Sequence, residues 1–143
     1  MEKLICLSEA KTKQAAAKLA KRLQGGAVLA LYGELGAGKT RFIQGLAEAL
    51  GIKSRVTSPT FNILRVYSLK GRKDKADSFY HIDAYRLASG RDLLALGAEE
   101  FLGVPNSIAA IEWAERVEDI LPPQTIRLRF RLLAGGEREI IIS

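Results

Sequence analysis

The chain has 143 residues, 48% of them hydrophobic, with 22 basic and 16 acidic residues and a formal net charge of +6. This size and composition predict one globular domain over residues 1–143 and exclude an intrinsically disordered chain. Because no apolar run has the length of a membrane span, residues 1–7 lack a signal-peptide pattern and Cys6 is the only cysteine, we expect a cytoplasmic protein with no membrane contact and no disulfide partner.

Strand and helix patterns alternate in the first third of the chain. Residues 2–7 predict a strand, and Ser8 suits the N-cap of a helix that runs to residue 24 and ends at Gly25 and Gly26. Residues 27–32 form an apolar run of buried-strand length. Residues 41–50 have helical spacing and stop at Gly51.

Between the last two elements, residues 33–40 read Gly-Glu-Leu-Gly-Ala-Gly-Lys-Thr and match the phosphate-loop pattern G-x-x-x-x-G-K-[ST] at every fixed position. Glycines let backbone N–H groups close around phosphate oxygens, and the following helix adds partial positive charge at its N-terminus. We expect Lys39 to reach the β- and γ-phosphates and the Thr40 hydroxyl to ligate Mg²⁺. The sequence therefore predicts a nucleoside triphosphate site.

The rest of the chain predicts two hairpins and shorter elements. Strands are expected over residues 61–69 and 78–83, joined by a charged turn at 70–75 into an antiparallel hairpin. Residues 85–102 predict helical pieces broken by Gly90 and Gly97, residues 107–112 a buried strand, and residues 114–120 a short helix stopped by two prolines. Residues 125–133 and 138–142 predict the second hairpin.

These elements predict an α/β fold of the P-loop NTPase type, with three layers and a central, mostly parallel sheet. The phosphate-loop strand is expected to lie in the centre, parallel to the strand ending at Glu112, and the antiparallel hairpins are expected to extend the sheet.

Two apolar strands end in acids, Asp83 and Glu112. Ligands of open α/β sheets bind beyond the carboxyl ends of the parallel strands, so either acid could hold Mg²⁺ and one could polarise water; the alternative is that each faces solvent. His81 shares a strand face with Asp83, and a structural role is its simpler interpretation. Trp113 either packs in the core or forms a wall of the phosphate site.

Two further features have alternative interpretations. Residues 57–61, Thr-Ser-Pro-Thr-Phe, form either a plain turn or a switch that senses the γ-phosphate.

Basic residues gather in the first helix and in the turn 70–75, where they are either solvated or contact RNA or an acidic protein surface. No aromatic residues alternate with these charges, so they do not predict a base-stacking platform.

Four segments together resemble the motifs of the bacterial TsaE (YjeE) family: the loop 33–40, Ser-Pro-Thr-Phe at 58–61, His-Ile-Asp-Ala-Tyr-Arg-Leu at 81–87 and Ile-Glu-Trp-Ala-Glu at 111–115. The resemblance covers nearly the whole chain. It implies a small Mg²⁺-dependent ATPase needed to make threonylcarbamoyladenosine in tRNA, next to the anticodon. It also implies that a TsaB–TsaD pair transfers the threonylcarbamoyl group, that this chain resets the pair by hydrolysing ATP, and that tRNA is a partner indirectly, through the complex.

The resemblance also implies roles for individual residues. Lys39, Thr60, Asp83 and Glu112 would be catalytic, and Thr40, Asp83 and Glu112 would hold Mg²⁺. The residues expected to contact the nucleotide are Ser8, Gly33, Glu34, Leu35, Gly36, Ala37, Gly38, Lys39, Thr40, Arg41, Trp113 and Arg138. Arg41 departs from the family, which commonly has a second hydroxyl residue there, but Thr40 carries the hydroxyl that Mg²⁺ needs.

Three alternatives compete with this interpretation. A small-molecule or nucleotide kinase would use the same loop, but it needs an acceptor pocket and a mobile lid, for which the chain has little room. A GTPase-like switch is disfavoured because the sequence lacks the guanine-reading Asn-Lys-x-Asp segment. A protein that binds RNA directly would show steeply salt-dependent binding.

Overall fold

The structure, a computed structural model, describes residues 1–34, 36–57, 62–74 and 76–143. None of the helices in these ranges is long and apolar enough to cross a membrane. The described elements, in chain order, are β1 (Glu2–Cys6), α1 (Glu9–Ala20), β2 (Val28–Tyr32), α2 (Lys39–Ala49), β3 (Leu64–Ser68), β4 (Ser78–Asp83), α3 (Gly90–Ala95), η1 (Ala98–Glu100), β5 (Ser107–Glu112), η2 (Ala114–Ile120), β6 (Ile126–Leu132) and β7 (Arg138–Ile142).

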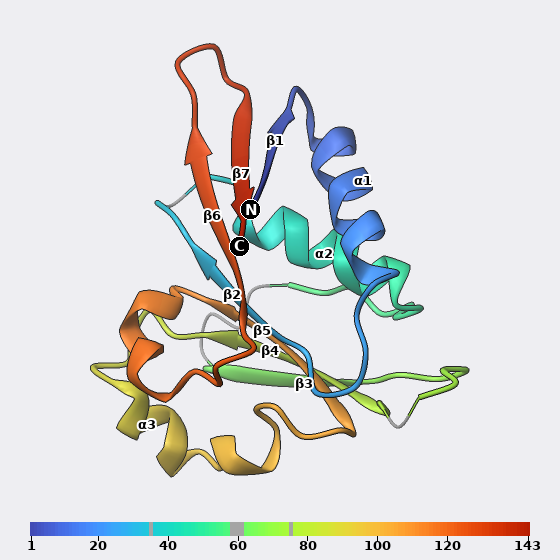
Figure 1. Cartoon of the computed structure of the whole chain (residues 1–143), viewed down its shortest axis with the longest axis vertical. Coiled ribbons are helices and arrows are strands. Elements are labelled where there is room, and N and C mark those ends of the chain that lie inside the picture. Colours follow the sequence, from blue (N-terminus) through green and yellow to red (C-terminus); the bar gives the residue numbers. More distant parts are fainter. Residues whose placement is uncertain (35, 58–61, 75) are drawn as a thin grey trace.

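The described strands form one mixed sheet in the order β1-β7-β6-β2-β5-β4-β3 (Figure 1). The central strand β2 pairs in parallel with β5 and β6, and β4 pairs in parallel with β5. The hairpins β3–β4 and β6–β7 are antiparallel, and β1 adds an antiparallel edge beyond β7. The predicted α/β fold, with a central phosphate-loop strand and two flanking hairpins, is confirmed.

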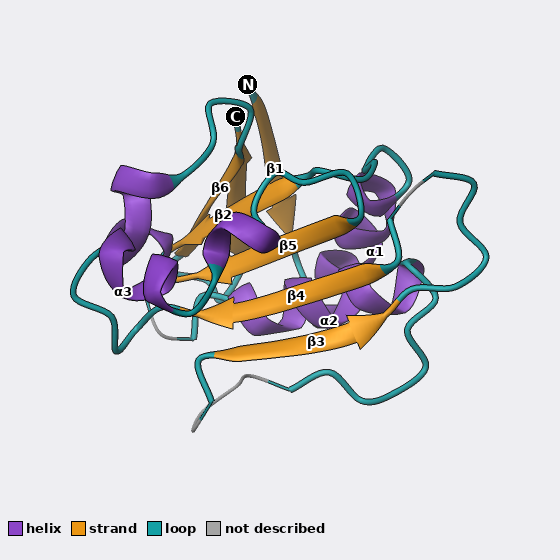
Figure 2. Ribbon diagram, turned by 90° about the horizontal axis from the view of Figure 1, so that it is seen from below, coloured by secondary structure: helices purple, strands orange, loops and turns teal. Residues whose placement is uncertain are grey.

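Helices cover both faces of the sheet, with a hydrophobic core on each. On one face, Leu29 and Leu31 of β2 pack with residues of α1 and α2. On the other face, Val28 and Ala30 belong to the core that lies against α3, η1 and η2. Figure 2 shows the helices arranged around the strands in this way. Every residue of β2 and β5 is buried, which explains why these strands read as continuous apolar runs.

The sheet brings the predicted acids to the phosphate loop. Because β2, β5 and β4 are parallel, their carboxyl ends lie at the same edge, where the chain leaves β2 and enters α2. Asp83 and Glu112 end neighbouring strands and are partners in the register. Their side chains therefore face the same side of the sheet as α2.

The observed helix boundaries differ from the predicted ones. The first helix ends at Ala20, not at residue 24, because the following turns are tighter: the Arg22 N–H donates to the Leu19 carbonyl and the Leu23 N–H to the Ala20 carbonyl. The second helix begins at Lys39, two residues earlier than its apolar spacing predicted.

Residues 85–102 were predicted to be helical in pieces with a break at Gly90, and this is wrong for the first piece. The Leu87 N–H closes a turn on the Ala84 carbonyl, and α3 begins at Gly90. A Cβ at Gly90 would lie 2.4 Å from Ile120 of η2. Glycine is needed there because η2 approaches closely, so this residue marks a packing contact and not a helix break.

The charged turn between β3 and β4 is not simply solvated. The Arg72 guanidinium is half-buried and donates to the Leu23 carbonyl at 2.9 Å and to the Asp74 carboxylate at 2.8 Å. Asp74 also accepts the Gly25 N–H at 2.9 Å. The turn is therefore tied to the connection between α1 and β2. The strand β3 itself is shorter than predicted and covers Leu64–Ser68, while residue 61 lies outside the described residues.

Candidate active site

The glycines of the phosphate loop hold a backbone that other residues rarely adopt. Gly33, Gly36 and Gly38 have φ angles of 140°, 82° and 103°. A Cβ at Gly33 would also lie 2.5 Å from the Phe130 carbonyl oxygen of β6. Gly38 is the N-cap of α2 and offers no side-chain cap, so the first N–H groups of the helix are available to an anion.

Lys39 is a buried cation at the start of α2. Its Nζ donates to the Gly33 carbonyl and lies 3.6 Å from the centre of the Trp113 ring. Burial lowers the pKa of Lys39, and the nearby carboxylates of Glu112, Glu115 and Asp83 oppose this shift. The loop therefore holds a partly desolvated positive charge, whose attraction to phosphate is stronger than it would be in bulk water.

Glu112 links the phosphate-loop helix to the neighbouring strands. Its side chain is almost fully buried at the end of β5. One carboxylate oxygen, Oε1, accepts the Thr40 hydroxyl at 2.9 Å, and the other, Oε2, lies 2.7 Å from His81 Nε2. Asp83 ends the next strand and accepts the Tyr85 N–H at 3.0 Å. Of the two acids, Glu112 is the one that contacts the Thr40 hydroxyl.

His81 is completely buried on β4 and contacts a residue of the candidate site. A carboxylate only accepts, so His81 Nε2 carries the proton in this hydrogen bond. Within the described residues, His81 Nδ1 has no hydrogen-bond partner. The complete burial of His81 agrees with the simpler prediction of a structural histidine. The structure adds that His81 orients the Glu112 carboxylate.

A pocket of about 700 Å³ opens where these residues meet. Among its lining residues are nine that were predicted to act in the site: Gly36, Gly38, Lys39, Thr40, Arg41, Asp83, Glu112, Trp113 and Arg138. The structure therefore brings most of the predicted site together from four different parts of the chain.

Trp113 combines both roles that the sequence left open. It follows β5 with a φ of 57°, packs partly buried against the core that contains Ala30, and lines the pocket. Tyr85 lies beside it, with ring centres 5.0 Å apart, and is 55% exposed. Arg138 approaches the loop from β7, and its buried Nε has no partner within the described residues.

Some predicted residues do not line this pocket. Gly33, Glu34 and Ala37 line an adjacent pocket of about 620 Å³ on the side of β6 and β7. The Ser8 oxygen caps α1 by accepting the Lys11 N–H at 3.2 Å, which confirms the predicted N-cap. Leu35 and Thr60 lie outside the described residues.

Two lining residues were not predicted as site residues, Glu9 and Tyr85. Tyr85 stands inside the segment 81–87 that carries the resemblance, so its position could have suggested a role. Glu9 has no such signal, because only the packing of α1 beside α2 brings it to the pocket; there it forms an ion pair with Arg41 at 3.4 Å.

The donor groups at this edge fit a hard cation. Within the described residues, no group of three or more His, Cys, Asp and Glu side chains is placed to hold a metal ion. Magnesium needs no such group, because it usually takes one or two carboxylates and completes its shell with waters and substrate phosphates. The Thr40 hydroxyl with Glu112 and Asp83 is a donor set of that kind.

Comparisons with known proteins agree on one family. The family described as "Threonylcarbamoyl adenosine biosynthesis protein TsaE" matches residues 6–140. The chain is similar to the tRNA threonylcarbamoyladenosine biosynthesis proteins TsaE of Treponema pallidum, with 46% identity over 85% of this chain and 84% of that protein, and of Bacillus subtilis, with 38% identity over 92% and 78%. Its fold is similar to the crystal structure of Bacillus subtilis YdiB, with a TM-score of 0.78, 33% identity and coverage of 97% of this chain and 82% of that one.

Proposed function

The chain belongs to the TsaE family of tRNA threonylcarbamoyladenosine biosynthesis proteins, and from this premise we propose that it is the subunit that binds and hydrolyses ATP in that pathway. One observation carries the proposal. The phosphate loop delivers Lys39 and Thr40 to the sheet edge where Glu112 accepts the Thr40 hydroxyl at 2.9 Å. A loop, a lysine, a hydroxyl and a strand-end acid are the parts that P-loop enzymes use on triphosphates.

Each part has a role in holding the nucleotide. The loop N–H groups and the N-terminus of α2 surround the phosphates, and Lys39 neutralises the β- and γ-phosphates. We include Arg138 as a residue that pairs with a phosphate or borders the adenine, and the support is that it lines the pocket and that its buried Nε has no partner within the described residues. We propose adenine as the base because the sequence lacks the guanine-reading segment.

Thr40, Glu112 and Asp83 would hold Mg²⁺, which would neutralise charge on the β- and γ-phosphates when bound. In hydrolysis, a water oxygen bonds to the γ-phosphorus while the bond to the bridging oxygen breaks; ADP leaves with the electron pair of that bond, and the released phosphate keeps both protons of the water as H2PO4−. Glu112 keeps the Thr40 hydroxyl in place, and Asp83, in register beside it, orients the attacking water. We include Thr60 among the catalytic residues on the basis of the family resemblance.

The remaining parts of the proposal concern the setting in which the chain acts. We propose that it works in the cytoplasm with a TsaB–TsaD pair, which transfers the threonylcarbamoyl group, and that ATP hydrolysis resets this pair between turnovers. The support for this is family membership.

Calorimetry with ATP and Mg²⁺, followed by a phosphate-release assay, tests the proposal. The wild-type chain is expected to take up one ATP and hydrolyse it slowly. Lys39→Ala is expected to lower ATP affinity at least about 100-fold, because it removes the buried cation that faces the phosphates, while thermal unfolding stays cooperative. Lys18→Ala, an exposed lysine on α1, is the matched control and leaves uptake unchanged.

Two outcomes would contradict the proposal. No uptake of ATP by the wild-type chain, alone or with TsaB and TsaD, removes its basis. Phosphate transfer to a common metabolite, faster than transfer to water, would instead favour the small-molecule or nucleotide kinase. A GTP affinity above the ATP affinity would correct the base specificity and leave the loop chemistry in place.

A further inference from the structure

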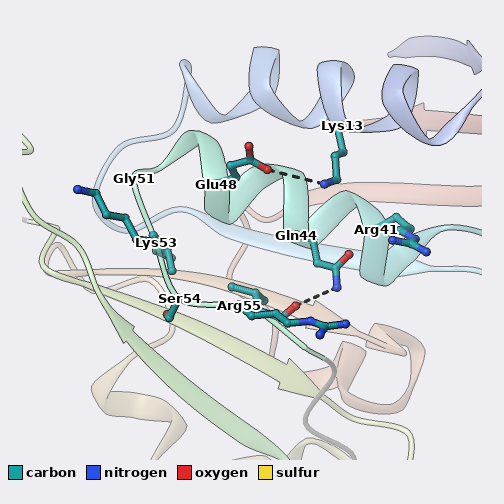
Figure 3. A pocket seen from close by; sticks show the side chains of 10 residues that line it. Lys13, Arg41, Gln44, Glu48, Gly51, Lys53, Ser54 and Arg55 are labelled. Carbon is teal, nitrogen blue, oxygen red and sulfur yellow. Dashed lines mark hydrogen bonds and ion pairs between the residues drawn. The ribbon is translucent and has the colours of Figure 1, made fainter.

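A basic groove lies beside the candidate active site. It is a pocket of about 640 Å³ between α2 and the segment that follows it. Lys13 reaches it from α1, Arg41 and Gln44 from α2, and Lys53 and Arg55 from the following segment (Figure 3). Arg41 also lines the pocket of the phosphate loop, so the two cavities adjoin.

A second basic pocket continues the groove. It has a volume of about 520 Å³ and shares Gly51 with the first. We call the two pockets together the basic band. Their described charged residues are Lys13, Lys21, Arg41, Lys53, Arg55, Lys70, Arg72 and Lys73, with the acids Glu48 and Asp74.

The excess of positive charge on the basic band equals the formal net charge of the whole chain. Eight basic and two acidic residues line it among the described residues, an excess of six positive charges. The formal net charge of the chain is also +6. The remaining residues of the chain therefore contain equal numbers of acids and bases, and the two adjoining pockets carry an excess of positive charge. Such an asymmetry is the electrostatic footprint of a polyanion-binding surface.

Most of these cations are available to a ligand. Lys13 is 3.8 Å from Glu48 and Arg41 is 3.4 Å from Glu9, both in exposed pairs that a phosphate can displace. Lys53 and Arg55 make no ion pair within the described residues. Arg72 differs, because it is held by Asp74 and the Leu23 carbonyl. The described lining residues include no aromatic side chain, so the band has no platform for stacking bases.

We propose that the basic band binds the phosphate backbone of RNA without reading its bases. Lysine and arginine spread over two adjoining pockets match a regular line of phosphates, and the absence of aromatic side chains from the described lining favours contacts that are independent of sequence. The choice of tRNA as the RNA rests on the proposed function. The inference goes beyond it, because the chain then contacts tRNA directly as well as through its complex.

Fluorescence anisotropy of the full-length chain with a labelled, unmodified tRNA transcript tests this, at 50–200 mM KCl. Wild type is expected to bind with an affinity that falls steeply with salt. Lys53→Ala combined with Arg55→Ala is expected to weaken binding about tenfold at the lower salt and to reduce the slope of log K against log[KCl] by about two. Lys18→Ala with Arg91→Ala removes the same charges outside the band and is expected to change binding less than about twofold.

An equal loss of tRNA affinity in the two double variants would overturn the proposal, because the net charge of the protein alone would then explain binding. Binding of polyglutamate that depends on Lys53 and Arg55, without binding of tRNA, would overturn it in favour of an acidic protein surface. Basal ATP hydrolysis by the Lys53/Arg55 variant is expected to equal that of wild type. Failure of the proposed function can be distinguished from failure of this inference. If the proposed function is wrong, the chain binds no ATP, while its binding of tRNA still depends on the basic band.

Discussion

At the scale of single residues, the contact between His81 and Glu112 is the arrangement that most affects the proposed chemistry. Both side chains are buried, and each Glu112 oxygen has one donor, from Thr40 and from His81. If either donor is lost, a buried carboxylate oxygen is left without a partner, which costs free energy. His81 is therefore a positioning residue, since it acts on the site only through Glu112.

A pair of substitutions tests this role. His81→Ala is expected to lower the free energy of unfolding by roughly 3 kcal/mol, because it leaves a cavity and an unpaired carboxylate oxygen. We expect it also to lower kcat for ATP hydrolysis about tenfold with little change in KM, because the loop that binds phosphate is untouched. His81→Gln can still donate to Glu112 and should recover most of kcat. Urea unfolding and phosphate-release kinetics measure both effects, and a KM that rises while kcat holds would contradict the positioning role.

At the scale of elements, the β3–β4 hairpin is locked to the α1–β2 connection by Arg72 and Asp74. The Arg72 guanidinium holds the pKa of Asp74 well below its usual range, with help from the Gly25 and Ala76 N–H groups and against the effect of burial. The lowered pKa means that the ionised Asp74 carboxylate stabilises the folded state. This stabilisation is fully present above the unfolded-state pKa of about 3.9, and it is lost as pH falls from there through the folded-state pKa.

This lock predicts a specific dependence of stability on pH. Asp74→Asn is expected to be less stable than wild type at pH 7. The difference is expected to shrink as pH falls below about 4, because the carboxyl is then protonated in the unfolded chain while it stays ionised in the folded one. Arg72→Gln removes the same interaction, so its free energy of unfolding should also fall less than that of wild type as pH is lowered. Urea unfolding at pH 7, 5, 4 and 3 measures this. If both variants kept the wild-type dependence, the hairpin lock would not be the source of the acid sensitivity.

At the scale of the whole molecule, the candidate active site lies at an exposed rim. Tyr85 is 55% exposed, and the ion pair that Arg41 forms with Glu9 is exposed as well. A partner that covers this rim would exclude water and add donors around the transferring phosphoryl group, and both effects favour the transition state. The basic band adjoins the same rim through Arg41.

We therefore expect the TsaB–TsaD pair to raise the rate of ATP hydrolysis at least about tenfold over that of the chain alone, since each factor of ten needs only about 1.4 kcal/mol of added transition-state stabilisation. Phosphate release measured with increasing amounts of the pair tests this, with Lys39→Ala as the inactive control. Identical rates with and without the pair would show that the site is already complete in the isolated chain.

Short-range patterns in the amino-acid sequence were enough to locate the phosphate loop, β4, β5 and β7. Glycine spacing, a lysine with a hydroxyl residue beside it, and apolar runs of strand length are properties of neighbouring residues, so they can be read from the chain without its fold. The parallel contact between β2 and β5 also followed, because strands of an α/β sheet order themselves in few ways.

Long-range packing decided the rest. Asp83 and Glu112 are equivalent as strand-end acids in the sequence, and only the position of α2 against the sheet makes Glu112 the one that accepts the Thr40 hydroxyl. Similarly, Arg72 looks like one charge among several in a turn, yet it becomes half-buried because the turn folds back onto Leu23. The Thr40–Glu112 contact joins residues 72 positions apart. Which residues meet in such contacts depends on how whole helices and strands pack, and the pattern of neighbouring residues in the sequence does not contain that information.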